Sequence, residues 1–472
     1  MSIITPREYQ IHGTNQLVRY ISKGYKRLVF QMPTGSGKTV TFAYFLQRYF
    51  AAYPDQQAKV IVHRDRLKVQ SEKTFRNFDI KNVGVFMVET FVNRLKTGMF
   101  KNTQLIIIDE CHWGSMRKIF EYFPDAIIIG FTATPIAATK KHPLKADYEQ
   151  IVVCTDIREL IALHEIDPTQ GLVPAKHYCP PSQINKKDIK RSGGDYNMRS
   201  MSNELCRTKL VDGVLKAYVD IGEHQKTIVF NSLVDHSLKV NDCFVAAGYN
   251  SRHLDGTMSK IEQDEIFQWF SETPDAILQT VDMATTGFDE PSIINVIPNR
   301  LTLSLPLWLQ MAGRGARPYP GKAHFNLIDP VGNVEQHGRW DHKHDWYSLF
   351  HYPAKAGKGV APMKVCPNPK CGCMIYMSST KCEYCGHLFP RDTVYTDMVV
   401  ELQLVPDNLI IPRNSPITLE KTIMSIAETV KSKPIDLFEK RNVMEYAVRK
   451  LHQQSGLNIS SNMAVHLASR HI

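Results

Sequence analysis

The sequence predicts an α/β protein: two tandem units, each a parallel sheet wrapped by helices, then a small cysteine-rich module and C-terminal helices. Three observations lead to this fold class. The length of 472 residues suggests about three folding units at roughly 150 residues each. Short β-branched runs alternate with helical patterns, which is typical of buried parallel strands joined by helices. The alternation runs to about residue 170 and restarts near residue 205.

The first unit is expected over residues 1–175 and the second over residues 200–340. In the first unit we expect strands at Arg27–Gln31, Lys59–His63, Leu105–Asp109 and Ala126–Phe131, and helices at Thr39–Ala52 and Arg66–Phe78. In the second we expect a helix at Leu205–Ile221 and strands at Thr227–Asn231, Ala276–Thr280, Ile293–Pro298 and Ala323–Asp329. The polar stretch Pro180–Arg199 holds Pro-Pro and Gly-Gly pairs, so it is expected to connect the units.

The rest of the chain divides by composition. Residues 341–364 are rich in His, Lys, Gly and Pro, which predicts a linker. Residues 365–392 hold the cysteine-rich module. Residues 393–472 are expected to be mainly helical, most clearly from Thr418 onward.

Composition limits the function classes. The 43% hydrophobic content excludes a disordered or fibrous chain. No stretch approaches the roughly 20 apolar residues of a membrane span, and the N-terminus has no signal-peptide pattern, so we expect a cytoplasmic protein without a membrane partner. The 57 Lys and Arg against 47 Asp and Glu give a net charge of +10, a weak indication of a polyanionic partner.

The segment MPTGSGKT (Met32–Thr39) has the pattern of a phosphate-binding loop. It follows an expected strand and opens an expected helix, and its glycines let backbone N–H groups approach phosphates. Lys38 would reach the β- and γ-phosphates, and the Thr39 hydroxyl would hold Mg²⁺. The strict pattern departs at its first position, where Met32 replaces glycine.

The segment LIIIDECH (Leu105–His112) delivers two adjacent carboxylates at the end of an apolar strand. Asp109 would bind Mg²⁺ and Glu110 would orient and deprotonate the attacking water. Alone, such a strand end could equally be a helix cap. Together with the phosphate loop it predicts an ATPase that uses ATP and Mg²⁺.

The ten cysteines fall into two sets. Five are scattered singly and are expected to be small buried hydrophobic residues (Cys111, Cys154, Cys179, Cys206 and Cys243). The other five crowd into 20 residues, where a C-x₄-C pair precedes a C-x₂-C pair. We expect a structural Zn²⁺ on Cys366, Cys371, Cys382 and Cys385, with Gly372 and Gly386 beside the pairs. Cys373 is the expected outsider, although C-x-C alternatives exist, and free buried thiols are the other possibility.

The motifs resemble those of superfamily 2 helicases in their DExH branch. PTGSGKT, DECH (Asp109–His112), TATP (Thr132–Pro135) and QMAGRGAR (Gln310–Arg317) resemble motifs I, II, III and VI. REYQ (Arg7–Gln10) resembles the adenine-reading region, VHRDRL (Val62–Leu67) motif Ia, and ETF (Glu89–Phe91) motif Ib. IVFNS (Ile228–Ser232) and TTGFDEP (Thr285–Pro291) resemble motifs IV and V. The set covers residues 3–330 and is most similar to bacterial RadD-like helicases and their restriction-subunit and phage relatives.

The resemblance implies two RecA-like domains with ATP between them. Arg314 and Arg317 would act as arginine fingers, and the spacing of this pair predicts that both lie on one helical face. Gln310 and His112 would couple the domains, while Thr132 and Thr134 would relay the ATP state. The implied nucleotide contacts are Arg7, Gln10, Thr34, Gly35, Ser36, Gly37, Lys38, Thr39, Asp109, Gly287 and Asp289.

The resemblance also implies a DNA strand held by phosphate contacts without sequence specificity. The implied contacts are His63, Arg64, Thr90, Ser232, Thr285 and Thr286. The expected function is an ATP-dependent DNA helicase or translocase acting on branched or partly duplex DNA in recombination, repair or replication, with possible protein partners from those processes. The alternatives are the motor subunit of a restriction system, an RNA helicase, and a non-catalytic nucleic-acid-binding protein.

Overall fold

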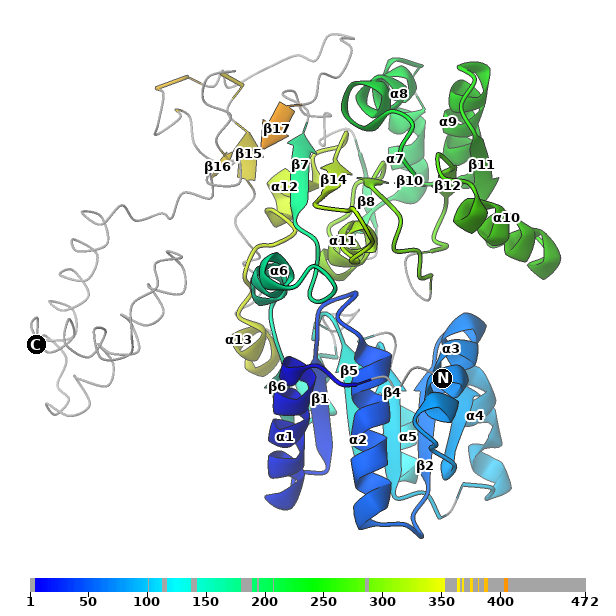
Figure 1. The fold of residues 1–472 in the computed structure, drawn as a ribbon, viewed down its shortest axis with the longest axis vertical. Helices are drawn as coiled ribbons and strands as arrows, with labels where there is room; N and C mark the ends of the chain where they lie inside the picture. Colours follow the sequence, from blue (N-terminus) through cyan, green and yellow to red (C-terminus); the bar gives the residue numbers. More distant parts are fainter. Residues whose placement is uncertain are drawn as a thin grey trace, which may run out of the picture. The chain divides into compact units, whose positions relative to one another are not determined.

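The computed structural model describes most of the chain up to residue 352. The described residues are 5–100, 102–112, 117–136, 142–179, 189–192, 195–206, 208–284 and 288–352, with the short stretches 363–365, 367–368, 374–376, 381, 386–388 and 403–405. The chain divides into two compact units, Met1–Val405 and Pro406–Ile472. All of the described residues lie in the first unit, whose described part contains two large sheets and two two-stranded ones (Figure 1).

The first lobe is built on a six-stranded parallel sheet with the order β3-β2-β4-β5-β1-β6. Its strands are β1 (Arg27–Gln31), β2 (Ala58–Val62), β3 (Val83–Met87), β4 (Leu105–Asp109), β5 (Ile127–Thr132) and β6 (Gln150–Val153). Its helices are α1 (Glu8–Ser22), α2 (Lys38–Ala52), α3 (Asp65–Asn77), α4 (Val88–Arg94), α5 (Arg117–Tyr122) and α6 (Ile157–Ile166), with the 3₁₀ turns η1 (Leu95–Thr97) and η2 (Leu144–Ala146).

Alternating strand side chains give this sheet two apolar faces. Leu17 of α1, Phe42 of α2 and Phe75 of α3 pack in one buried cluster with strand residues such as Ile107. Phe91 of α4, Ile119 of α5 and Leu160 of α6 pack in another with residues such as Ile106. Because both faces are covered, the strands are near-continuous hydrophobic runs, as the sequence predicted.

The second lobe has a seven-stranded sheet with the order β11-β12-β10-β13-β14-β7-β17. Its strands are β7 (Ala175–Cys179), β10 (Thr227–Phe230), β11 (Ser251–Leu254), β12 (Ile277–Thr280), β13 (Asn295–Ile297), β14 (Phe325–Ile328) and β17 (Gln403–Val405). All pairings are parallel except that of β17 with β7. The helices are α7 (Met198–Leu205), α8 (Thr208–Gly222), α9 (Val234–Ala246), α10 (Lys260–Glu272), α11 (Leu305–Ala312) and α12 (Asn333–His337), with the turn η3 (Gly313–Gly315).

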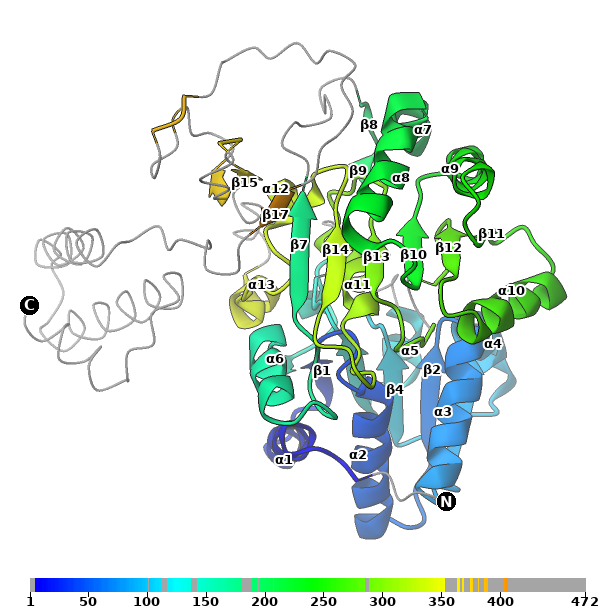
Figure 2. The same ribbon diagram turned by 45° about the horizontal axis from the view of Figure 1, so that its top comes forward.

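The helices of the second lobe also cover two faces. Val214 of α8 and Phe244 of α9 pack in a cluster with strand residues such as Val229. Phe270 of α10 and Trp308 of α11 pack in another cluster, the one that continues into the first lobe. Figure 2 shows the two groups of helices on either side of the sheet. The two tandem α/β lobes of the prediction are therefore confirmed.

Several elements differ from the sequence-based expectation. Strand β7 begins at residue 175, the expected end of the first unit, but lies in the second sheet beside β14. The expected connection Pro180–Arg199 contains a short hairpin, β8 (Arg191–Ser192) with β9 (Asp195–Tyr196), and the start of α7. The expected helix Leu205–Ile221 corresponds to α8, which α7 precedes as a separate helix.

The expected linker 341–364 contains a packed helix, α13 (Trp346–His351). Trp346 and Phe350 are 6% and 1% exposed, and α13 packs against β6 and η2 of the first lobe. The aromatic residues of this stretch therefore bury a hydrophobic face, which the His, Lys, Gly and Pro content obscured. Beyond it, β15 (Met363–Val365) and β16 (Met374–Tyr376) form an antiparallel pair. Within the described residues, no helix is long and apolar enough to cross a membrane.

Candidate functional site

The phosphate-loop segment lies where β1 ends and α2 begins. Gly35 and Gly37 have φ angles of +85° and +87°, a conformation that favours glycine. Gly37 is the N-cap of α2, so Lys38 and Thr39 stand in the first helical turn. The Ser36 hydroxyl donates to the carbonyl of Pro33 at 2.6 Å and holds the loop closed. This cradle of backbone N–H groups at a helix N-terminus suits a phosphate.

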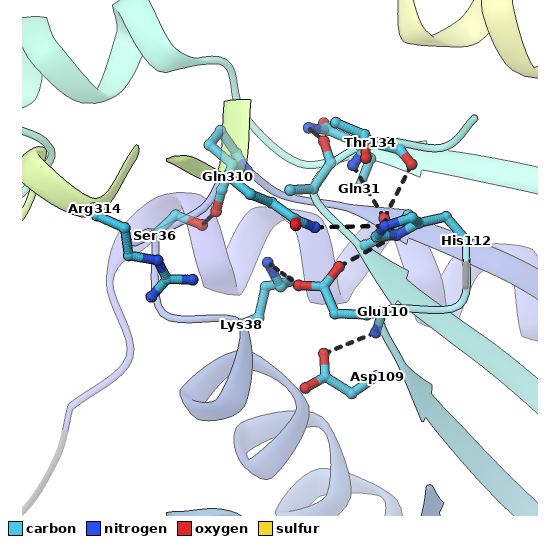
Figure 3. Close-up of polar contacts among 12 residues, drawn as sticks. Gln31, Ser36, Lys38, Asp109, Glu110, His112, Thr134, Gln310 and Arg314 are labelled. Atoms are coloured by element: carbon cyan, nitrogen blue, oxygen red, sulfur yellow. Dashed lines mark hydrogen bonds and ion pairs between the residues drawn. The ribbon is translucent and has the colours of Figure 1, made fainter. Parts of the chain in front are cut away.

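Lys38 and the two carboxylates at the C-terminal end of β4 meet in one cluster (Figure 3). The Lys38 Nζ lies 3.1 Å from Oε1 of Glu110. The backbone N–H of Glu110 donates to Oδ1 of Asp109 at 3.1 Å. Glu110 has a φ of +51°, a strained value for a side-chain-bearing residue that turns its carboxylate away from that of Asp109.

The pKa values of Asp109 and Glu110 are shifted in opposite directions. Burial, reinforced by the charge of Glu110, raises the pKa of Asp109 to about 7. Burial would also raise the pKa of Glu110, but Lys38, His112 and Arg314 outweigh it and hold that pKa below its ordinary value. Opposite shifts in adjacent acids are typical of a site in which each acid has its own role. Two buried carboxyl oxygens beside a phosphate cradle also form a donor set that suits Mg²⁺.

Tyr9 and Gln10 connect α1 to the phosphate loop, and Arg7, which with Gln10 was predicted to contact the adenine, bonds to Tyr9. Gln10, 2% exposed, donates its amide N–H groups to the carbonyls of Ser36 and Gly37, both at 3.3 Å. The hydroxyl of Tyr9 donates to the carbonyl of Ser36 at 2.8 Å, and Arg7 donates to that hydroxyl at 3.2 Å. The polar atoms of Gln10 thus brace the loop in this structure.

Arg314 approaches the cluster from the second lobe. It is half-buried, it donates to the carbonyl of Phe288, and its charge lowers the pKa of Glu110. Burial, the larger cause, and the charge of Arg317 lower the pKa of Arg314 to about 10, so its guanidinium remains charged at neutral pH. Arg317 pairs with Asp289 at 2.6 Å.

The prediction that Arg314 and Arg317 share a helical face is wrong. Helix α11 ends at Ala312, and the chain continues through the 3₁₀ turn Gly313–Gly315. A Cβ on Gly315 would lie 2.3 Å from the ring of Phe325, and one on Gly313 would lie 3.1 Å from Cβ of Thr34. Gly313 thus lets the second lobe pack directly against the phosphate loop, and Gly315 lets the turn pack closely on β14 of its own lobe.

His112 links the two lobes. Its Nδ1 lies 2.7 Å from the hydroxyl of Thr132, and its Nε2 lies 3.4 Å from the amide nitrogen of Gln310. Burial lowers the pKa of His112 to about 4, so the ring is neutral at pH 7. The Thr132 hydroxyl also accepts a bond from the backbone N–H of Thr134 at 3.0 Å. The residues predicted to couple the lobes are therefore in contact.

The residues predicted to contact a DNA strand differ in their exposure and in their partners. Thr90 is exposed and His63 is half-buried, with a pKa lowered by burial. Arg64 donates to the carbonyl of Asp282 in the second lobe at 3.1 Å. Ser232 is fully buried, with its hydroxyl 2.9 Å from Nδ1 of His236. Thr285, Thr286 and Gly287 lie outside the described residues.

Sequence reasoning missed a second interlobe arginine. Arg66 in the first turn of α3 pairs with Asp264 of α10, and its guanidinium lies 3.7 Å from the ring centroid of Phe267. It also missed the network that holds Ser232, in which the amide of Asn299 lies 3.3 Å from Nε2 of His236. Arg66 belongs to the VHRDRL segment, which could have drawn attention to it. Nothing in the sequence marks the partners on the other lobe.

The four predicted zinc ligands, Cys366, Cys371, Cys382 and Cys385, and also Cys373, lie outside the described residues. The described segments beside them form two antiparallel pairings: β15 with β16, and Lys381 with Leu388. Gly386 has a φ of +74°. Elsewhere in the described part of the chain, no three residues with metal-binding side chains lie together.

Comparisons with known proteins identify two families. The family described as "Type III restriction enzyme, res subunit" matches residues 3–99 and 83–137, and the "Helicase conserved C-terminal domain" matches residues 209–319. A "51.5 kDa protein" of Lactococcus phage (isolate 7-9) is 30% identical over 384 residues, which cover 80% of this chain and 81% of that protein.

Two other relatives are longer than this chain. The "Putative ATP-dependent helicase IRC3" of Saccharomyces cerevisiae is 28% identical, and the "Type I restriction enzyme EcoAI endonuclease subunit" of Escherichia coli is 26% identical. Each match covers 69% of this chain, but only 51% of the yeast protein and 46% of the bacterial one. The chain thus spans about half the length of these two relatives.

Solved structures share the fold. A fragment of a "putative HsdR subunit of a type I restriction enzyme" from Vibrio vulnificus superposes with a TM-score of 0.55 at 23% identity, covering 71% of this chain and 65% of that chain. The "ATP-dependent Type ISP restriction-modification enzyme LlaBIII bound to DNA" superposes with a TM-score of 0.51 at 17% identity, covering 69% of this chain and 28% of that one.

Proposed function

The chain belongs to the superfamily 2 helicases, similar to restriction-subunit-like proteins and built on two tandem RecA-like lobes, and on this premise we propose that it is an ATP-dependent DNA helicase or translocase of the DExH branch. It would move on and remodel branched or partly duplex DNA in recombination, repair or replication. The observation that carries the proposal is the meeting of Lys38, Asp109 and Glu110 in one lobe with the charge of Arg314 from the other.

The residues of the first lobe divide the work at the ATP site. Lys38 and the backbone of Thr34–Gly37 would hold the phosphates. Thr39 and Asp109 would hold Mg²⁺, which neutralises developing phosphate charge when bound. Glu110, whose pKa stays low, is ionised at neutral pH and would orient and deprotonate the attacking water. Burial, reinforced by the charge of Glu110, raises the pKa of Asp109, and a bound cation would favour its ionised form.

Residues of the second lobe would complete the site. Arg314 and Arg317 would act as arginine fingers, since fixed positive charge stabilises the transferred phosphoryl oxygens. Asp289 pairs with Arg317 in this structure. Asp289 and Gly287, two residues earlier in the sequence, would contact the nucleotide. Gln310 and His112, which are in contact across the two lobes, would couple the movements of the lobes.

Phosphate contacts would hold one DNA strand across both lobes. His63, Arg64 and Thr90 would contribute from the first lobe, and Ser232, Thr285 and Thr286 from the second. Such contacts position a strand without reading its bases, so binding should be independent of sequence. Since Ser232 is buried and Arg64 contacts Asp282, strand binding would require local rearrangement at both residues.

ATP hydrolysis by wild type and Lys38→Ala, with and without single-stranded DNA, tests the motor. Wild type should hydrolyse ATP faster with DNA. Lys38→Ala should lose at least about a hundredfold in kcat/KM, because a charged phosphate ligand is removed. Lys68→Ala, which removes a lysine of α3 whose side chain is 40% exposed, is the matched control and should keep its activity. Absence of DNA-stimulated turnover in the wild type would contradict the proposal.

A second candidate function is the motor subunit of a restriction system. It is favoured by the similarity to type I restriction subunits, one of them 26% identical over 387 residues. A motor subunit would show translocation but require a partner chain for cleavage. An RNA helicase would be stimulated by RNA rather than DNA, and a non-catalytic binder would not turn over ATP. Comparing forks, four-way junctions and 3′- and 5′-tailed duplexes, in DNA and RNA, separates these outcomes.

We also propose a structural Zn²⁺ on Cys366, Cys371, Cys382 and Cys385. The proposal is supported by the spacing of the cysteines and by the antiparallel pairings on either side of them. The purified chain should contain about one equivalent of zinc, and Cys382→Ser with Cys385→Ser should lose it. The matched control, Cys243→Ser outside the module, should retain it. Less than about half an equivalent in the wild type would contradict the site.

A further inference from the structure

The two lobes contact each other along two edges that differ in chemistry. The first edge lies beside β6 and contains residues 338–352, here called the strap, which run from the second lobe back to the first. Trp346 and Phe350 of the strap are buried in the cluster that joins both lobes. The carbonyl of Asp341 accepts a bond from Arg158 at 3.0 Å, and Lys343 pairs with Asp156 at 2.9 Å. This edge is held mainly by buried apolar surface.

The second edge lies beside β2 and β12 and is ionic. Arg66 of α3 pairs with Asp264 of α10, with side chains 39% and 55% exposed. The Arg66 guanidinium also lies over the ring of Phe267. Nearby, Arg64 donates to the carbonyl of Asp282, whose side chain pairs with Arg300. No covalent connection between the lobes runs along this edge within the described residues, since the chain crosses between β6 and β7 and returns through the strap.

Energetics distinguish the two edges. An exposed ion pair between the lobes would change the equilibrium between their joined and separated arrangements by about 1.4- to 5-fold, and an exposed cation–π contact by a similar factor. A single buried aromatic side chain changes it by more than about a hundredfold. The ionic edge is therefore the one that separates first when the lobes move.

Arg66 lies where a bound strand would compete for it. It stands in the first turn of α3, two residues after Arg64, which with His63 is among the strand contacts proposed for this lobe. Its guanidinium is occupied by a carboxylate of the other lobe. A backbone phosphodiester offers two non-bridging oxygens with the same single negative charge, and its neighbouring phosphates add to the attraction.

We propose that Arg66, Asp264 and Phe267 form a latch between the lobes, which opens when a phosphate of a bound nucleic-acid strand replaces Asp264 on Arg66. The latch makes Arg66 a strand-binding residue and Asp264 its competitor. Without a strand, the latch holds the lobes together with Arg66 paired to Asp264. Binding of a strand phosphate to Arg66 therefore breaks this contact between the lobes at the same time. This inference rests on the proposed strand binding.

Two neighbouring carboxylates of α10 provide a matched test. Asp264→Asn removes the partner of Arg66, and Glu265→Gln removes an exposed carboxylate one residue away. Both change the net charge by +1, so they raise the general attraction for a polyanion equally. A labelled polythymidine strand and the full chain, measured by fluorescence anisotropy without nucleotide, give the dissociation constants.

Asp264→Asn should bind the strand about two- to five-fold more tightly than Glu265→Gln. Arg66→Ala should bind more weakly than wild type, with the slope of log K against log salt concentration reduced by about one. In the Arg66→Ala background, Asp264→Asn should gain no more than Glu265→Gln does. Thermal melting of each variant checks that these exposed substitutions leave the fold intact.

The outcomes separate the latch from the proposed function. Equal affinities of Asp264→Asn and Glu265→Gln, or tighter binding by Arg66→Ala, would overturn the latch while DNA-stimulated ATP hydrolysis by the wild type still supports the motor. If wild type neither binds the strand nor is stimulated by it, the proposed function fails and the latch falls with it.

Discussion

Asp109 and Glu110 show how one strand end can hold two acids with different properties. The left-handed backbone of Glu110 turns its side chain toward Lys38 and His112, whose charge and contacts lower its pKa. Asp109 remains buried next to a second carboxylate, so its pKa rises to about 7. The strain at Glu110 is thus the local cost of giving the acids separate environments.

The raised pKa of Asp109 predicts a pH-dependent stability. A carboxyl whose native pKa lies near 7, against an ordinary value of 3.8, favours the folded state when protonated, and this contribution is lost as pH rises from about 4 to about 7. Asp109→Asn should therefore be more stable than wild type at pH 8 in EDTA, by about 2–4 °C in Tm, with little difference near pH 4. Calorimetry at pH 4, 6 and 8 measures this.

The exposed Asp125 provides the control for this prediction. Its side chain is 93% exposed, so Asp125→Asn should show no comparable pH-dependent gain. Mg²⁺ should reduce the difference in Tm between wild type and Asp109→Asn at pH 8, because a bound cation stabilises the ionised carboxylate of the wild type. A lower Tm for Asp109→Asn than for wild type at pH 8 would contradict the pKa argument.

The local environment of these residues could be predicted only in part. Lys38, Asp109 and Glu110 could be brought together from the sequence because their motifs end parallel strands at the same edge of a sheet. The burial of Ser232 and the pairing of Arg64 with the second lobe could not, because they depend on contacts between residues more than 200 positions apart or on a network around His236.

At the scale of elements, α13 is the clearest departure from the sequence-based expectation. The helix has six residues, too few for helical periodicity to stand out from a stretch rich in His and Lys. Its two buried aromatic residues are four positions apart, which places them on one face against β6. Strands with continuous apolar runs could be recognised, whereas elements without such a run, such as α13 and β7 (AKHYC), could not.

Phe350 and Tyr347 on α13 test whether this helix is part of the folded core. Phe350 is 1% exposed and Tyr347 is 49% exposed. Phe350→Ala should lower the free energy of unfolding by about 3–5 kcal/mol, because it removes a buried ring and leaves a cavity. Tyr347→Ala should change it by less than about 0.5 kcal/mol. Urea unfolding curves compare the two, and similar values would mean that α13 is not packed as described.

At the scale of the molecule, the order of elements along the chain differs from their order in space. The sequence predicted two separate α/β units in tandem, and both sheets are present. The second sheet, however, takes β7 from the segment that leaves the first lobe, and the strap returns to the first lobe from the second. The first lobe thus contains chain that a cut at residue 340 would assign elsewhere, and a cut at residue 175 falls at the first residue of β7. Only long-range pairing decides this, and a single sequence does not record it.

The antiparallel pairing of β17 with β7 has a practical consequence for shortened versions of this protein. Residues 403–405 cover one side of β7, which would otherwise be the last strand of its sheet. A chain that stops before residue 403 would leave the backbone N–H and C=O groups of β7 open to pairing with another molecule, which favours aggregation. The cysteine-rich module is therefore better removed by an internal deletion that keeps Gln403–Val405 than by truncation, since a truncated protein could lose activity through self-association alone.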